Sequence, residues 1–398
     1  MQDFGGLPAA DIGTRALGTR FLVFPQPSFV SGYQEPEVVW ISTPPGQIKP
    51  GPSDHRIYVT DPLTPKDPYG YPYLPPFAGA QGPPAEPGPD GHFDHLAPGS
   101  RAFLSAHAFA CVRRVLDICE GYLGRRLPWF FEPNYERLEI VPHISWDNAQ
   151  SGFGYMELGY DDSVPGQPNP YALNFDVIGH ETGHLVLLNA LGIPQDVSRG
   201  DFLPYHEAVA DLISLLAVLQ FDSVLDKTLR RTRGNLLVTN ELDRLAELSD
   251  TKQIRMASHS LRMRDVGNDV HDRSRPFTGA MFDTGVEIFQ LLLCERGLAE
   301  LDTRTIRDVR SDLSQEEIDN ELSTSRDEYE LDHFAFKATL IEARDLMAEM
   351  LMGSLQKIDV EALTFRDAAE AIVLTAEAGR GRRFADRTYD NFAWREIL

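Results

Sequence analysis

The chain has 398 residues, with 60 acidic and 37 basic side chains and a formal net charge of −23. This balance argues against a surface that neutralises a nucleic-acid backbone and against binding to an anionic membrane. Hydrophobic residues at 42% and aromatic residues at 10% indicate a folded globular protein, long enough for one two-lobed enzyme or several domains. No apolar run approaches the roughly 18 residues of a membrane helix, so no membrane span is expected.

The three cysteines argue against a disulfide framework. Cys111 and Cys119 lie in a helical pattern about 12 Å apart along the helix axis, too far for a disulfide. With Cys294 the count is odd and sparse, which suits a reducing compartment. The first residues lack the basic region and the apolar stretch of a signal peptide. These features favour the cytoplasm, with secretion of a processed form as the alternative.

Residues 1–99 form a Pro/Gly-rich segment that is expected to contain short strands. Glu37–Ile41 contains Val, Val, Trp and Ile in succession, which favours a strand, and residues 56–60 form a second extended run. Residues 79–91 are rich in Pro, Gly and Ala, which predicts a linker or a loop laid over the surface. The alternative for this segment is a proline-rich ligand for a partner protein.

After Ser100 the pattern becomes helical. Apolar residues recur at steps of three and four as far as Gly124, a residue type that commonly ends helices. Residues 138–144 alternate towards a strand, and the Gly- and aromatic-rich residues 153–160 follow as an expected hairpin. A helix is also expected over residues 240–248.

A candidate metal site begins with two histidines. His180 and His184 are four residues apart, so on a helix both imidazoles lie on one face and can hold one metal ion. Glu181 completes an H-E-x-x-H motif, in which the glutamate acts as a general base. Two histidines at this spacing also fit an ordinary amphipathic helix, so this motif alone does not decide the matter.

A second acidic pair supplies the rest of the expected site. A catalytic zinc ion takes three protein ligands and keeps a fourth position for water. Glu207, 23 residues after His184 in a second helical stretch, is the candidate third ligand. Asp211 lies one turn further on and can accept a hydrogen bond from the free ring nitrogen of a ligand histidine. This second pair favours a zinc site over the ordinary helix.

The sequence resembles the gluzincin metallopeptidases, and the thermolysin-like branch in particular, over about residues 100–398. The matching pattern is His180-Glu181-x-x-His184 followed by Glu207-x-x-x-Asp211. The resemblance implies a zinc-dependent endopeptidase that hydrolyses peptide or protein substrates through a metal-activated water. Zn²⁺ would be held by the two histidines and Glu207, and Glu181 would take the proton of the water and pass it to the leaving amine.

The resemblance also implies an α+β fold of the two-lobed zincin type. A mixed α/β N-terminal lobe would contain an edge strand and the active-site helix, and the C-terminal lobe would be mostly helical. The implied organisation is the Pro/Gly-rich segment over residues 1–99, a catalytic lobe over 100–225 and a helical lobe over 226–398.

Three further residues gain candidate roles from the resemblance. His271, with Ser274, resembles a Val-His-x-x-Ser segment whose histidine hydrogen-bonds the tetrahedral oxyanion, and it should lie in a loop before a helix over 278–293. Asn148 and Ala149 resemble edge-strand residues that bind the substrate backbone by strand addition. An exposed loop histidine and an ordinary hairpin are the alternatives.

Other positions match the family less well. Tyr205 is the only tyrosine between the second histidine and Glu207, too close to Glu207 for the family's oxyanion tyrosine. Arg262 resembles a substrate-binding arginine but lies unusually close to His271. Asp176 matches a calcium ligand, yet the position of a second acidic ligand is Val218, so we expect no paired calcium site.

Two other functions stay open at this point. One is a gluzincin of another branch, such as an aminopeptidase, because Gly154-Tyr-Met156-Glu157 partly matches a Gly-x-Met-Glu-Asn segment, although Leu158 replaces the Asn. The other is a metal-retaining pseudoenzyme that acts as a binding protein. Cleavage of peptides with blocked or free N-termini distinguishes an aminopeptidase from an endopeptidase. Loss of a metal-dependent rate on changing Glu181 to Gln distinguishes an enzyme from a pseudoenzyme.

Overall fold

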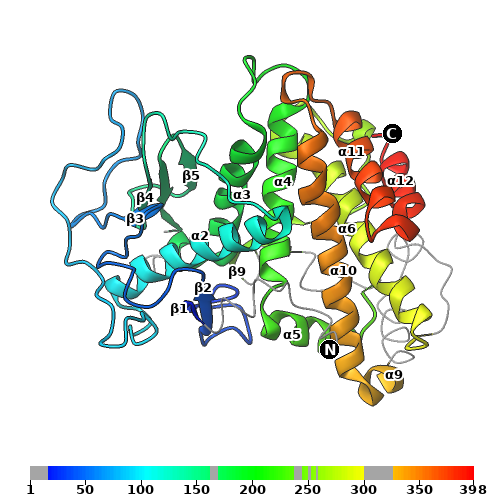
Figure 1. The fold of residues 1–398 in the computed structure, drawn as a ribbon, viewed down its shortest axis with the longest axis horizontal. Helices are drawn as coiled ribbons and strands as arrows, with labels where there is room; N and C mark the ends of the chain where they lie inside the picture. The colour runs from blue at the N-terminus through cyan, green and yellow to red at the C-terminus, as the bar shows by residue number, and fades with distance from the viewer. Residues whose placement is uncertain (1–16, 162–168, 237–243, 250–251, 257–258, 300–325) are drawn as a thin grey trace. The chain divides into compact units, whose positions relative to one another are not determined.

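A computed structural model describes residues 17–161, 169–236, 244–249, 252–256, 259–299 and 326–398 (Figure 1). The fold is mixed α/β, with small sheets and many helices. The chain divides into two compact units. We call them the strand unit, which holds the described parts of 8–189 and 246–254, and the helical unit, which holds those of 190–245 and 255–398.

The strand unit is built on a four-stranded sheet with the order β3-β4-β6-β5. Its strands are β3 (Ile57–Val59), β4 (Leu138–Val141), β5 (Ala149–Gly152) and β6 (Tyr155–Leu158). β3 and β6 run parallel to β4, and β5 runs antiparallel to β6, with Ala149 opposite Leu158. All four residues of β4 are buried, as expected for the interior of a mixed sheet. A hairpin is therefore present, but it begins at Ala149, before the expected residues 153–160, and β5 is the last strand of the sheet.

Helix α2 (Arg101–Leu123) packs against a second, two-stranded sheet in the same unit. That sheet pairs β1 (Thr19–Val23) with β2 (Glu37–Ile41), the strand expected from the sequence. Ser100 caps α2, because its side chain accepts the N–H of Phe103. Gly124 follows the helix with φ +64°, a conformation that favours glycine. Both ends of this helix are confirmed.

The remaining elements of the strand unit lead to the metal-motif helix. They are β7 (Tyr160–Asp161), β8 (Asn169–Pro170), the 3-10 turn η1 (Tyr171–Leu173) and α3 (Phe175–Leu191), whose last two residues belong to the helical unit. β9 (Arg244–Ser249) and β10 (Lys252–Met256) pair as two strands. The helix expected over 240–248 is therefore wrong from Arg244 onwards, and residues 240–243 lie outside the described part.

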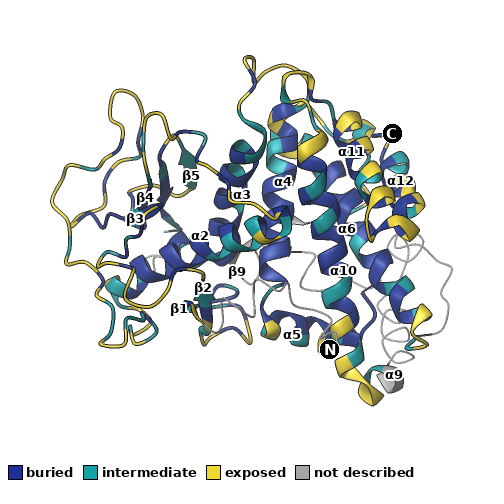
Figure 2. Cartoon of the chain, in the orientation of Figure 1, coloured by how far each residue is buried: buried dark blue, intermediate teal, exposed yellow. Residues whose placement is uncertain are grey.

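The helical unit packs three long helices side by side, α4 with α6 and α6 with α10 (Figure 1). Figure 2 shows buried residues along most of their length. The long helices are α4 (Phe202–Val218), α6 (Val270–Glu295) and α10 (His333–Ser354). The other elements are α5 (Asp222–Thr232), η3 (Met263–Asp265), α9 (Arg326–Leu331), η4 (Leu355–Lys357), η5 (Val360–Ala362), α11 (Phe365–Ala378), η6 (Arg382–Phe384) and α12 (Ala385–Trp394).

α6 is the central helix of this unit and is longer than expected. Among the described residues it alone, as a single helix, is long and apolar enough to cross a membrane, but 78% of its apolar window is buried, as in a core helix. Gly279 on this helix has no side chain, and a Cβ there would lie 2.6 Å from the guanidinium carbon of Arg395. The glycine thus leaves room for a fully buried ion pair between Arg395 and Asp283.

The division into two units differs from the three parts expected from the sequence. The Pro/Gly-rich segment packs into the strand unit, where two buried carboxylates hold it. Glu139 on β4 accepts the hydroxyls of Tyr58, at 2.8 Å, and of Tyr69. Glu157 on β6 pairs with the Lys66 ammonium group and accepts the Tyr69 N–H at 2.9 Å. Buried carboxylates need such donors, so the segment wraps the sheet at fixed points.

All three cysteines lie in the described part of the chain, and none forms a disulfide. Cys111 and Cys119 are buried in α2, and burial raises the pKa of both thiols. The absence of a disulfide between Cys111 and Cys119 agrees with their expected separation along the helix.

The buried His107 of α2 leads to a prediction about pH. Its Nε2 accepts the backbone N–H of Phe24 at 3.0 Å, and burial lowers the pKa of the ring from 6.5 to about 4. The unfolded chain therefore binds a proton that the folded chain rejects between these pH values, so stability is full above about pH 6.5 and falls towards pH 4. The loss from this group is on the order of 3 kcal/mol.

The measurement is the urea midpoint of unfolding between pH 7 and 4 for the parent and for His107→Gln, which retains an acceptor for Phe24. We expect a shallower pH dependence in the variant, whatever its stability at pH 7. Equal slopes would contradict the assignment of this loss to His107.

Candidate metal centre

The metal motif lies on α3, which is well defined at both ends. Asn174 precedes the helix, and its side-chain oxygen accepts the N–H groups of Asp176 and Val177 at 3.0 and 3.2 Å. Asp176 is buried in the first turn, where its Oδ1 accepts a hydrogen bond from Gln26 at 3.2 Å. After the helix, Gly192 adopts φ +83°. Asn174 and Gly192 thus fix the two ends of the helix that carries the metal motif.

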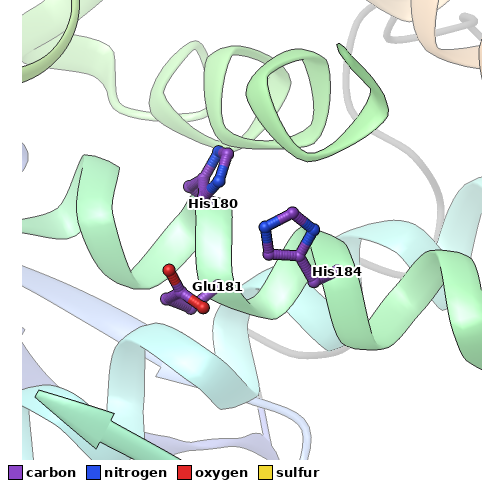
Figure 3. Close-up of side chains that lie close together, drawn as sticks. All are labelled: His180, Glu181 and His184. Carbon is purple, nitrogen blue, oxygen red and sulfur yellow. The ribbon is translucent and has the colours of Figure 1, made fainter. Parts of the chain in front are cut away.

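His180, Glu181 and His184 come together on α3 (Figure 3). The two imidazole rings are 4.5 Å apart between centroids and nearly perpendicular. One ligand atom from each of the three side chains lies within 4.8 Å of the others. Figure 3 shows the carboxylate of Glu181 on a different side of the helix from the two rings, as expected for a residue rotated by about 100° from its neighbour.

The edge hairpin is tied to this part of α3. The hydroxyl of Ser151, on β5, donates to the backbone carbonyl of Glu181 at 3.0 Å. Asn148 is exposed just before β5, and its side chain accepts the N–H of Ala149 at 2.9 Å. Strand β5, which was expected to bind substrate, is thus attached to α3 at Glu181, the expected general base. Ser151 was not predicted from the sequence, because a lone serine in a strand carries no signal of such a contact.

Glu207, Asp211 and His271 lie in the helical unit. Glu207 is on α4, and Asp211 is buried one turn further along the same helix. The Nε2 of His271 lies 3.4 Å from the Oε2 of Glu207. The structure therefore brings the predicted oxyanion residue next to the predicted third ligand, although they are 64 positions apart in the chain.

His271 is not in a loop, contrary to the expectation. It occupies the first turn of α6, because Asp269 caps the helix and accepts the N–H groups of His271 and Asp272 at 3.0 and 3.2 Å. The same carboxylate lies 3.7 Å from the Nδ1 of His271. Asp265, a second acidic residue shortly before His271, instead accepts the N–H of Arg262.

Two residues that matched the family poorly are engaged elsewhere. Tyr205 is fully buried, and its ring packs edge-on against Phe277 with centroids 5.3 Å apart. Burial also raises the pKa of its phenol. Arg262 lies over the ring of Trp394, with its guanidinium carbon 4.3 Å from the ring centroid. Both positions are those of packing residues.

No protein-family model matches this chain, and no curated protein matches it in sequence. Among solved structures, the chain is similar to the precursor of protealysin, a metalloproteinase from Serratia proteamaculans. The TM-score is 0.52 and the sequence identity 14%, over 90% of this chain and 92% of that one. The mixed α/β fold is therefore shared with a metalloproteinase precursor, which confirms the coarser part of the expectation about fold.

Proposed function

We propose that this protein is a zinc-dependent endopeptidase of the thermolysin-like gluzincin type, with the two-lobed organisation of that family. The observation that carries the proposal is the cluster of His180, Glu181 and His184 on one helix of a chain whose fold is shared with a metalloproteinase precursor. Two histidines that can hold a metal ion, with a glutamate beside them, form the arrangement that metal-assisted hydrolysis of amides requires.

The donor set fits zinc. Two imidazole nitrogens and a carboxylate oxygen are typical ligands of catalytic zinc, and we propose His180, His184 and Glu207 in these roles. Support comes from the 4.5 Å separation of the two rings and from the half-buried positions of His184 and Glu207. A zinc ion held there would acidify a water molecule and polarise the carbonyl of the substrate.

The side chains of the protein would then move the proton and hold the substrate. Glu181 would accept a proton from the attacking water and return it to the leaving amine. His271 would donate a hydrogen bond to the oxyanion, and Asn148 and Ala149 would bind the peptide backbone beside the scissile bond. Support for these roles comes from the burial of Glu181 and from the position of β5 at the end of the sheet.

The aminopeptidase alternative is less well supported. A free amino terminus is attracted by a carboxylate, and Glu157 is the carboxylate of the segment 154–158 that partly matches aminopeptidases. Its side chain is instead fully buried, paired with Lys66, and accepts hydrogen bonds from Gln150 Nε2 at 2.6 Å and from the N–H of Tyr69. A carboxylate already neutralised by a lysine has little to offer a second ammonium group.

The test is zinc analysis of the purified protein together with cleavage of a peptide library with acetylated and free N-termini. We expect about one zinc per chain and cleavage of both peptide classes at internal bonds, lost on chelation and restored by Zn²⁺. Cleavage restricted to free N-termini would favour the aminopeptidase. Bound zinc without hydrolysis of any peptide would favour the pseudoenzyme.

Asp211 provides a separate prediction about metal affinity. If it orients a ligand histidine, Asp211→Ala should weaken zinc binding by roughly 10–100-fold. Competition with a chromogenic chelator measures the change, and circular dichroism verifies that the variant is folded. An exposed carboxylate of the same unit, changed in Asp386→Ala, serves as the control. Equal affinities in the Asp211 variant and the parent would remove Asp211 from the site.

A further inference from the structure

Asp201 stands at the junction of three helices in the helical unit. It occupies the residue before α4, where an aspartate usually caps the helix, but its side chain makes no capping hydrogen bond. Its Oδ1 instead accepts the Nε–H and Nη2–H of Arg273 on α6, at 3.1 and 2.9 Å. Its Oδ2 accepts the N–H of Phe365, the first residue of α11, at 3.0 Å. The carboxylate of Asp201 thus accepts hydrogen bonds from α6 and α11 and does not cap α4.

The backbone around Asp201 is also fixed. Its N–H donates to the carbonyl of Leu363 at 3.0 Å. The preceding Gly200 has φ +67°, and a Cβ there would lie 2.3 Å from the same carbonyl oxygen. Only glycine fits at that position, so the chain enters α4 clamped against the segment before α11. Asp201 is therefore a stationary acceptor for Arg273.

The ion pair lies close in sequence to Glu207 and His271, the two residues of the helical unit that were predicted to act in the site. Arg273 is two residues after His271 on α6, and Asp201 is six residues before Glu207, which is about 9 Å along the axis of α4. The pair is partly exposed, with 34% of the Arg273 side chain and 14% of the Asp201 side chain accessible. Such pairs contribute little to stability, but a guanidinium that donates two hydrogen bonds fixes a geometry well.

We infer that the Arg273–Asp201 pair is a positioning element, which sets the register of α6 against α4 and so holds His271 beside Glu207. The inference rests on the proposed function for its kinetic test only. It assigns no contact with substrate to either residue of the pair.

The kinetic test compares Arg273→Met with Arg275→Met, a matched control. Arg275 lies on the same helix and pairs only loosely with Asp272, at 3.9 Å. We expect Arg273→Met to lower kcat about tenfold or more with KM little changed, because a small misplacement of a reacting group is costly. Arg273→Lys should recover part of the loss, and the control should match the parent.

A double-mutant cycle separates positioning from general damage. In a His271→Ala background, Arg273→Met should have little further effect on kcat, because the residue through which it acts is gone. The same fold-loss in both backgrounds would overturn the inference. Asp201→Asn, which keeps an oxygen for the Phe365 N–H, provides a second variant if Arg273→Met folds poorly.

A measurement without any catalytic readout keeps this inference distinct from the proposed function. In protein labelled at histidine rings, the signal of His271 is assigned by its loss in His271→Ala. We expect this signal to shift or broaden in Arg273→Met and Asp201→Asn and to stay unchanged in Arg275→Met. An unchanged His271 signal in all three variants would overturn the inference, whether or not the protein cleaves peptides.

Discussion

Replacing Glu181 with Gln is expected to lower peptide hydrolysis by at least about 100-fold, the scale for losing a general base, while the zinc content stays near that of the parent. Glutamine keeps the size and polarity of the side chain but cannot accept a proton. Glu181 is rotated by about 100° from His180 on α3. Its carboxylate comes within 4.8 Å of the imidazole nitrogens but is poorly placed to bind the metal alongside both of them. Loss of the carboxylate should therefore affect proton transfer and not metal binding.

The experiment measures kcat/KM on a quenched peptide and zinc per chain in the same preparations. Glu132→Gln, an exposed carboxylate of the same unit, is the control and should match the parent in both measurements. A Glu181→Gln protein that retained full peptidase activity would show that the hydrolytic mechanism is wrong. The metal would then have a structural role or serve a different reaction.

His184→Ala should abolish both zinc retention and hydrolysis. Its imidazole and that of His180 are 4.5 Å apart between centroids, so the two form one chelating pair and removal of either leaves a weak site. Glu207→Gln should weaken metal binding and activity together, in contrast to Glu181→Gln. The two glutamates are thus told apart by zinc content alone.

Metal retention is measured after dialysis against a weak chelator, with His333→Ala, an exposed histidine, as the control. The control should keep its full zinc complement. Stoichiometric zinc in His184→Ala after this treatment would contradict the ligand assignment, and full zinc in Glu207→Gln would remove Glu207 from it.

Much of the local structure could be predicted from the sequence because it depends on local signals. Ser100 and Gly124 mark the ends of α2, and the Gly- and aromatic-rich residues 153–160 predict a hairpin at β5–β6. The start of α6 was missed, since Pro276 and three charged residues in its first turns, Asp272, Arg273 and Arg275, mask the helical period. Only the capping carboxylate of Asp269 indicated that start.

The metal motif of the candidate site could be predicted from the sequence, but the contacts between helices around it could not. The spacing of His180, Glu181 and His184 follows from helix geometry alone, and the structure brings these three together. The approach of His271 to Glu207 depends on how α6 packs against α4, and the resemblance alone pointed to it. The Asp201–Arg273 pair left no trace in the sequence, because Asp201 looks like an ordinary helix cap.

The buried pair of Lys66 and Glu157 has a consequence for how the chain is made. The two residues are separated by 91 positions, and a ribosome adding about 5–20 residues per second needs roughly 5–20 s to cover that distance. During this time the four-stranded sheet is incomplete, so Lys66 and the Pro/Gly-rich segment around it cannot pack against it. Newly synthesised chains should therefore be cut by proteases in this segment first, and a chaperone that shields it would act before the metal helix has emerged.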